Sequence, residues 1–188
     1  MQGADAGRAN HEAVPATRVR VLGRVELDDR AADQALGRGQ ARELLALLVA
    51  RRDAPVTTES VIDALWPDDP PATAPTIVHG LVRRVRAALG PEAVTHDAAG
   101  YRLALPAAAV DLWALDDAAR RSEQSAVRAG WREPVFGQYA DRGWAVAAAR
   151  GLGHLRGPAL AATGLRRARQ VGPVSRLVGR RRELAAVT

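Results

Sequence analysis

The sequence predicts an α+β fold, in which a winged helix-turn-helix comes first and a short all-helical part follows. Three observations lead to this prediction. Residues 19–27 alternate between apolar and polar side chains as a strand does, residues 40–89 contain three amphipathic helical patterns, and residues 94–105 have the pattern of a hairpin. Strands, three helices and a terminal hairpin, in this order, are typical of a winged helix.

The first strand follows a polar stretch without periodicity. Residues 1–17 are rich in Ala, Gly and polar side chains, which predicts a disordered arm. From residue 18 onward apolar side chains recur at every second position, and we expect a bend at Leu22 and Gly23. Residues 28–30 then predict a polar turn, and residues 34–36 a short return strand.

Two helices are expected next. Residues 40–52 place a stripe of Leu and Val on one face, and residues 53–55 end that helix with a proline. The following helix begins with Thr57 or Thr58 as its cap. It ends after Trp66, where a run of Pro and Asp residues opens a loop.

The third helix, at residues 76–89, has the most informative pattern. One arc of it is apolar and predicts a buried face, which consists of Ile77, Val78, Leu81, Val82, Val85, Ala88 and Leu89. The opposite side carries Thr76, His79, Arg83 and Arg86, with Arg84 on the flank and no acidic residue. Because Arg can form two parallel hydrogen bonds to guanine or to phosphate, such a face suits a DNA major groove. The alternative is an ordinary surface helix with a solvated arginine face.

Gly80 interrupts this helix, where glycine costs about 1 kcal/mol relative to alanine. Two explanations are open: a neighbour approaches the helix closely, or the helix tolerates the glycine. Gly90 and Pro91 then predict the end of the helix. A hairpin is expected from residues 94–96 and 101–105, and its Arg102 is placed to contact a phosphate.

Composition limits the classes of protein to which this chain can belong. Its 188 residues, 47% of them hydrophobic, allow one medium domain or two small ones with a buried core. The absence of cysteine excludes disulfides and thiolate metal sites. No secretory signal is visible, and no apolar stretch approaches the roughly 20 residues of a spanning helix. We therefore expect a cytoplasmic protein without a membrane partner.

The charge of the chain is unevenly distributed. All 27 basic residues are arginine, and the net charge is +6. Residues 18–105 hold 12 arginines and 12 acidic residues, whereas residues 111–188 hold 14 arginines and 7 acidic residues. DNA binding by the first part would therefore depend on where its arginines lie, not on its total charge.

Five motifs occur in the order and at the spacing of a known family: VRVLGRVEL, ELLALLVAR, ALWPDDPP, VRRVRAALG and GYRL. Residues 19–105 resemble the DNA-binding domain of the antibiotic regulatory protein family of actinomycetes, whose fold is the OmpR/PhoB-type winged helix. The resemblance implies a DNA-binding domain at 18–106 and a recognition helix at 76–89. It also implies that the loop at 66–75 is the segment that faces RNA polymerase in relatives.

The resemblance assigns groove or phosphate contacts to a set of side chains on the helix and the wing: Thr73, Thr76, His79, Arg83, Arg84, Arg86, Tyr101 and Arg102. In the polymerase-facing loop it points to Trp66, Asp68 and Asp69. Relatives bind direct repeats in promoters as paired protomers, so the implied partners are double-stranded DNA, RNA polymerase and a second protomer on the DNA. Members often have Gln, Ser or Thr where this chain has Gly80, which can make no side-chain contact.

The second part resembles a shortened form of the family's bacterial transcriptional activation domain, an all-helical, TPR-like module. The run AGWREPVFGQYADRGWAVAAARGL carries this resemblance within residues 107–170. We expect helices of the module to be missing between Arg121 and Trp131, and the shortened module to fold loosely, because stacked helical repeats bury their faces only against neighbours. Residues 171–188 look like the start of an NTPase module, but no GxxxxGK[ST] motif follows, so no NTPase activity is expected.

No residue pattern predicts catalysis, a cofactor or a metal site. The four histidines lack ligand spacing, and Asp68 and Asp69 are neighbours in a proline-rich turn. No receiver domain precedes the winged helix, so the phosphorelay control of related folds is not expected. The winged helix predicts a sequence-specific DNA-binding transcriptional regulator, and the resemblance implies an activator of a secondary-metabolite gene cluster that acts at the nucleoid. The alternatives are a protein-interaction module and an inactive, truncated remnant of a larger regulator with an NTPase domain.

Overall fold

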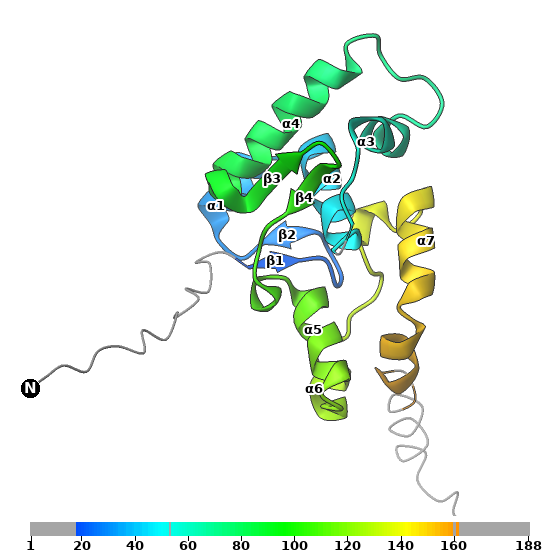
Figure 1. The fold of residues 1–188 in the computed structure, drawn as a ribbon. Helices are drawn as coiled ribbons and strands as arrows, with labels where there is room; N and C mark the ends of the chain where they lie inside the picture. The colour runs from blue at the N-terminus through cyan, green and yellow to red at the C-terminus, as the bar shows by residue number, and fades with distance from the viewer. Residues whose placement is uncertain (1–17, 53, 160, 162–188) are drawn as a thin grey trace, which may run out of the picture.

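A winged helix and a group of shorter helices pack into one body in the computed structural model of the chain (Figure 1). The structure describes residues 18–52, 54–159 and 161. The predicted arm at 1–17, the end of the predicted helical part at 162–170 and the predicted tail at 171–188 lie outside the described residues. The α+β winged helix with an all-α part, predicted from the sequence, is confirmed.

The N-terminal hairpin is shorter than the alternating pattern predicts. Strands β1 (Val19–Arg20) and β2 (Glu26–Leu27) pair antiparallel, with Val19 opposite Leu27. Between the strands, the backbone forms hydrogen bonds with the helical part instead. The carboxylate of Asp111 accepts the N–H groups of Val21 and Leu22 at 2.9 and 3.1 Å. These backbone groups are therefore satisfied without a longer ladder.

The prediction of a return strand at residues 34–36 is wrong, because these residues form the end of helix α1 (Arg30–Leu36). Asp29 caps this helix by accepting the N–H group of Ala32 at 2.7 Å. The carboxylate of Asp33 accepts the N–H group of Leu27 at 2.9 Å and so joins the helix to the hairpin. A capping aspartate after the strand favours the helix more strongly than the short apolar run favours a strand.

The next three helices confirm the predicted order. They are α2 (Gln40–Ala50), α3 (Thr58–Leu65) and α4 (Ala74–Leu89). The N-cap of α3 is Thr57, whose hydroxyl accepts the N–H group of Ser60 at 3.1 Å. Helix α2 is buried over residues 41–49 and lies at the centre of the molecule, where it contacts α3, α4 and the helical part.

The wing follows α4 after a short 3-10 turn, η1 (Pro91–Ala93). Its strands β3 (Val94–Asp97) and β4 (Gly100–Leu103) pair antiparallel, as the predicted hairpin requires. Gly100 has a φ of +125°, and a Cβ atom there would lie 2.5 Å from the carbonyl oxygen of Val56. Glycine thus allows β4 to approach the chain before α3, where Tyr101 and Val56 exchange backbone hydrogen bonds of 2.9 Å.

The helical part contains η2 (Ala107–Ala109), α5 (Asp111–Arg120), α6 (Gln124–Gly130), η3 (Gly137–Tyr139) and α7 (Gly143–Gly151). Helix α6 occupies the stretch in which we expected helices to be missing. Figure 1 shows α5 and α6 below the N-terminal hairpin and α7 beside them. In the described residues no helix has the length and apolar character needed to cross a membrane.

The helical part is not a separate layer, because it shares one hydrophobic core with the winged helix. The indole N–H of Trp113 on α5 donates to the carbonyl oxygen of Val49 on α2 at 3.0 Å. Glu43, a buried residue of α2, accepts from the guanidinium of Arg142 at 2.8 Å, although burial raises the pKa of its carboxyl. We call this contact region the seam: the β1–β2 hairpin and α2 form one side, and α5, η3 and α7 form the other.

Candidate nucleic-acid interface

Helix α4 is positioned by its buried face. Ala74, Val78, Leu81, Val82 and Val85 are all buried in the shared core. Pro75 lies in the first turn, where its missing N–H has no intrahelical partner to lose, and the helix ends at Gly90. The predicted apolar arc thus fixes the rotation of α4 about its axis, which decides the side chains that reach solvent.

The opposite face of α4 forms an exposed ridge. Four of the side chains predicted to contact DNA project from the helix into solvent: Thr76, His79, Arg83 and Arg84. Thr73, just before the helix, is also exposed. Within the described part of the chain, neither Arg83 nor Arg84 donates a hydrogen bond or forms an ion pair. We call Thr73, Thr76, His79, Arg83 and Arg84 the α4 ridge.

Gly80 lies within this ridge and faces open space. A Cβ atom built at this position meets no other atom within 4 Å. Of the two explanations that the sequence left open, close approach of a neighbour is therefore excluded among the described residues. The helix tolerates the glycine, which leaves a gap between His79 and Arg83 on the exposed face.

Arg86 has a different environment from the ridge. Its side chain is half-buried, and both its Nε and Nη2 atoms donate to the carbonyl oxygen of Val94, at 2.9 and 2.7 Å. This pair of hydrogen bonds ties the last turn of α4 to the first residue of the wing. Arg86 thus holds the ridge and the wing at a fixed distance from each other.

The two predicted wing residues face opposite sides of the hairpin. Tyr101 is 2% exposed, and its ring stacks on that of His96 with 4.4 Å between the centroids. Arg102 is half-exposed and lies 3.9 Å from the carboxylate of Asp97 across the hairpin turn. Tyr101 therefore anchors the wing, whereas Arg102 can reach a ligand outside the protein.

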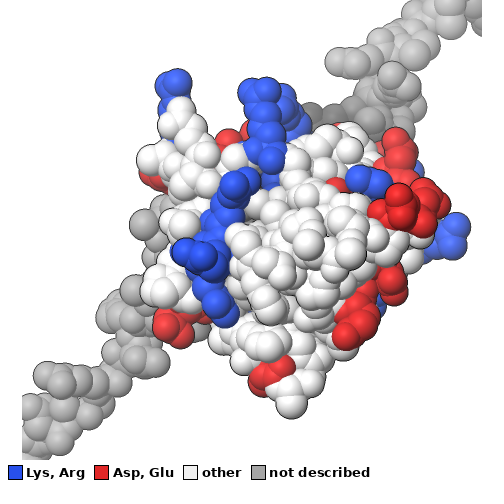
Figure 2. Space-filling view, turned by 90° about the horizontal axis from the view of Figure 1, so that it is seen from above, with Lys and Arg blue, Asp and Glu red and all other residues white. Residues whose placement is uncertain are grey.

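The predicted polymerase-facing loop separates α3 from α4. Asp68 and Asp69 are exposed there, and Trp66 is half-buried against the core. Figure 2 looks down on the molecule from above: basic side chains form a band on its left side, and most acidic side chains gather at the right edge. In the described residues no three His, Asp or Glu side chains cluster as metal ligands would.

The winged-helix part of the chain is similar to known transcriptional regulators. Residues 35–103 match the family "Transcriptional regulatory protein, C terminal". The regulatory protein AfsR of Streptomyces coelicolor is 34% identical over 118 residues, which are 62% of this chain and 12% of AfsR. The transcriptional regulatory protein EmbR of Mycobacterium tuberculosis is 34% identical over 125 residues, which are 56% of this chain and 32% of EmbR.

These matches support an OmpR/PhoB-type winged-helix domain in residues 35–103 that is similar to those of AfsR and EmbR, regulators of the antibiotic regulatory protein family. A solved structure of Mycobacterium tuberculosis EmbR in complex with a low-affinity phosphopeptide superposes with a TM-score of 0.60 and 25% identity. The superposition covers 81% of this chain and 47% of the EmbR chain, so the likeness extends beyond the winged helix. The matched segments span a third or less of the AfsR and EmbR sequences.

Sequence reasoning about the OmpR/PhoB-type domain missed two determinants of the interface. The first is the tie between Arg86 and Val94, which depends on where the wing folds back and leaves no local signal. The second is the burial of Tyr101. Here the sequence does carry a signal, because Tyr101 and Leu103 alternate with Arg102 in one strand, so the two apolar side chains share the inner face.

Proposed function

We propose that this protein is a sequence-specific DNA-binding transcriptional regulator that inserts the α4 ridge into a major groove. The observation that carries the proposal is Arg83, which is exposed on the outer face of α4 in a winged-helix domain and has no ion-pair partner in the part of the chain that the structure describes. Thr76 and His79 flank it with shorter hydrogen-bonding groups. An arginine with free donors can form a bidentate pair with guanine, whose edge is exposed in the major groove.

The surroundings of the ridge support a second set of contacts. Arg84 and Thr73 lie on its flank and its start, where phosphates would border the groove, and Arg102 of the wing can contact the backbone. In this proposal Arg86 and Tyr101 do not contact DNA themselves. They hold the wing in place from inside the protein. Thr76, His79 and Arg83 would contact bases, whereas Thr73 and Arg84 of the ridge and Arg102 of the wing would contact phosphates.

The finer parts of the proposal come from the family. We place RNA polymerase against the loop that contains Trp66, Asp68 and Asp69, and two protomers on direct repeats in a promoter. The outcome would be activation of a secondary-metabolite gene cluster. Such a regulator acts by binding alone, without catalysis or a cofactor, and it works on the nucleoid in the cytoplasm.

The test is fluorescence-anisotropy binding of the purified chain to the DNA upstream of its own and neighbouring genes, at two salt concentrations and with random competitor DNA. Arg83→Ala is expected to lower the affinity by about 1–3 kcal/mol if Arg83 contacts a base. If it contacts a phosphate, the salt dependence should fall by about one unit of slope. Arg150→Ala, at an exposed position of α7, is the matched control and should change neither quantity.

Two results would contradict the proposal. Binding that random competitor DNA abolishes would show only non-specific attraction to phosphates. Equal affinity and equal salt dependence of the wild-type chain and Arg83→Ala would remove the ridge from the site. Capture of a protein partner that is insensitive to salt, in the absence of DNA binding, would favour an interaction module instead.

A further inference from the structure

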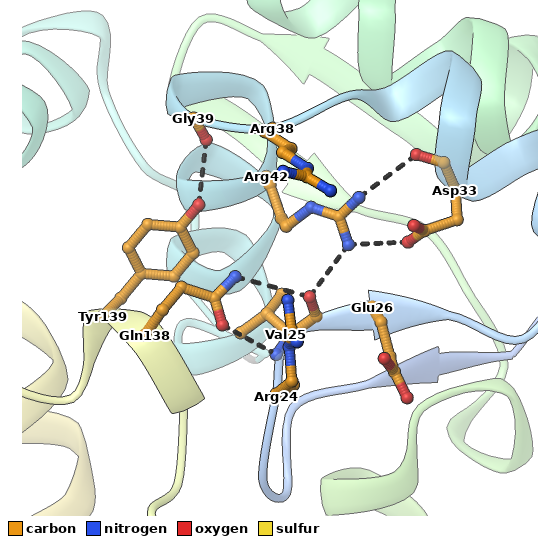
Figure 3. A pocket seen from close by; sticks show the side chains of 9 residues that line it. All are labelled: Arg24, Val25, Glu26, Asp33, Arg38, Gly39, Arg42, Gln138 and Tyr139. Atoms are coloured by element: carbon orange, nitrogen blue, oxygen red, sulfur yellow. Dashed lines mark hydrogen bonds and ion pairs between the residues drawn. The ribbon is translucent and has the colours of Figure 1, made fainter.

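A concave pocket, which no residue of the α4 ridge lines, lies between the winged helix and the helical part (Figure 3). Its walls come from the β1–β2 hairpin, α1 and the turn after it, the start of α2, and η3 of the helical part. Its volume is about 330 Å³. This lies at the small end of the range for ligand sites, about 300–1,000 Å³, so the pocket suits a small molecule better than a polymer strand.

Three arginines line this pocket, and one of them is fully occupied by the protein. Arg42 donates to the carbonyl oxygens of Gly37 and Val25, both at 2.9 Å, and forms an ion pair of 2.6 Å with Asp33. Its guanidinium lowers the pKa of the Asp33 carboxyl, which stays ionised and neutralised. Arg42 is thus held rigidly in the wall of the pocket, and its charge is neutralised by the carboxylate of Asp33.

The other two arginines, Arg24 and Arg38, have no such partners. Both are exposed, and within the described residues neither guanidinium donates a hydrogen bond or forms an ion pair. Figure 3 shows Arg24 reaching into the pocket from the hairpin and Arg38 reaching into it from the opposite side. Glu26 also lines the pocket, but in the same view its carboxylate points away from the arginines. The pocket therefore has two arginines in its lining that form no ion pair or hydrogen bond among the described residues.

The remaining walls are held in place by the seam. The hydroxyl of Tyr139 donates to the carbonyl oxygen of Gly39 at 2.9 Å. The side chain of Gln138 accepts from the N–H group of Val25 at 3.2 Å. Gly39 is also the N-cap of α2, and no side chain caps that helix, so the positive end of its dipole adds to the charge of the arginines. The pocket is consequently formed before any ligand arrives.

We propose that this pocket binds the phosphate group of a small molecule between Arg24 and Arg38. Phosphate oxygens accept paired hydrogen bonds from a guanidinium, and two guanidinium groups can hold one dianion from opposite sides. The ligand would bridge the hairpin, which belongs to the seam, and the turn that precedes α2. Inorganic phosphate and a phosphorylated metabolite share this chemistry, and the experiment separates them.

The experiment is isothermal titration calorimetry on the full chain without DNA, at constant ionic strength maintained with sodium chloride. The probes are inorganic phosphate and ribose 5-phosphate. We expect saturable binding with one site per chain, and a rise in Kd of about tenfold or more for Arg24→Gln and for Arg38→Gln, because each removes charge-assisted hydrogen bonds. Tighter binding of ribose 5-phosphate would identify a phosphorylated metabolite, whereas equal Kd values would identify the free ion.

Arg150→Gln is the matched control, because it removes the same charge from α7, away from the pocket. Without ligand, both pocket variants should melt at the wild-type temperature, since neither arginine has a partner among the described residues. The proposal would be overturned if the wild type and Arg38→Gln bound the probes with equal affinity. It would also be overturned if the wild type bound neither inorganic phosphate nor ribose 5-phosphate. A loss of DNA affinity in Arg38→Gln without phosphate binding would also overturn it and assign Arg38 to the DNA backbone.

Discussion

The arginines of the α4 ridge and those of the seam are chemically identical but do different things. Arg83 and Arg84 project into solvent without a partner among the described residues. Arg142, by contrast, lies across the seam from Glu43 and forms an ion pair of 2.8 Å with it. An arginine paired across the seam, such as Arg142, therefore holds the chain together, whereas an arginine on the ridge is available to a ligand. The predictions that follow test this division, beginning with the largest effect.

The seam should carry much of the stability of the chain. Trp113→Ala removes a side chain that is 4% exposed, together with its hydrogen bond to Val49. We expect the free energy of unfolding to fall by about 3–5 kcal/mol, measured by urea denaturation followed by circular dichroism. Val146→Ala, on the exposed side of α7, should change it by about 0.5 kcal/mol or less. Similar losses in the two variants would mean that the seam is not part of a cooperative core.

Arg86 should behave as a seam arginine although it belongs to α4. Arg86→Ala removes both donors to Val94 and is expected to lower the free energy of unfolding by about 1–2 kcal/mol. Arg83→Ala should leave the stability unchanged and weaken DNA binding. Comparing the denaturation midpoint with the DNA affinity in both variants sharpens the division. An Arg86→Ala variant with wild-type stability and a DNA affinity as low as that of Arg83→Ala would place Arg86 on the ridge instead.

A smaller effect is expected at Gly80, which faces open space. Gly80→Ala should raise the free energy of unfolding by up to about 1 kcal/mol, because alanine is the better helix former and its methyl group meets no neighbour. The thermal midpoint measures this gain, and DNA affinity should stay close to that of the wild type. A destabilised variant would show that the outer face of α4 is covered by part of the chain.

The smallest effect concerns the pH dependence of the ion pair between Asp33 and Arg42. Arg42 lowers the pKa of Asp33 in the folded chain, so the ionised carboxylate stabilises folding. That contribution is complete above the ordinary carboxyl value of about 3.9 and is lost as the pH falls through the lowered folded value. We expect the wild type to melt above Asp33→Asn at neutral pH, and the difference to shrink toward about pH 3. A difference that stays constant with pH would contradict this assignment.

Helical periodicity was enough to predict the ridge but not its limits. The apolar arc of α4 shows which face is buried, and the structure buries Val78, Leu81, Val82 and Val85 as that pattern requires. Periodicity places Arg86 on the side opposite the buried face, together with Arg83. Its burial depends on the position of Val94, which is a tertiary contact without a local signal.

The helical part was harder to predict, because its helices are short and its partner is the winged helix. Comparison with a longer repeat module suggested missing helices before Trp131, yet α6 fills that stretch and buries Val127 in the shared core. The expectation of a loose fold, which stays a prediction, assumed that helices must stack on further repeats. Here they pack on α2 and the hairpin instead, through Asp111 and Trp113.

The hairpin and the segment before α7 are joined mainly through main-chain atoms. The N–H group of Gly23 donates to the carbonyl oxygen of Pro134 at 3.1 Å, and that of Phe136 donates to the carbonyl oxygen of Val21 at 2.7 Å. Gly137 comes so near that a Cβ atom there would lie 2.4 Å from the oxygen of Gly23. Peptide groups are common to nearly all amino acids, so most side chains on both segments can be exchanged over evolution without separating them. Glycine at 137 is the position where such drift would be resisted.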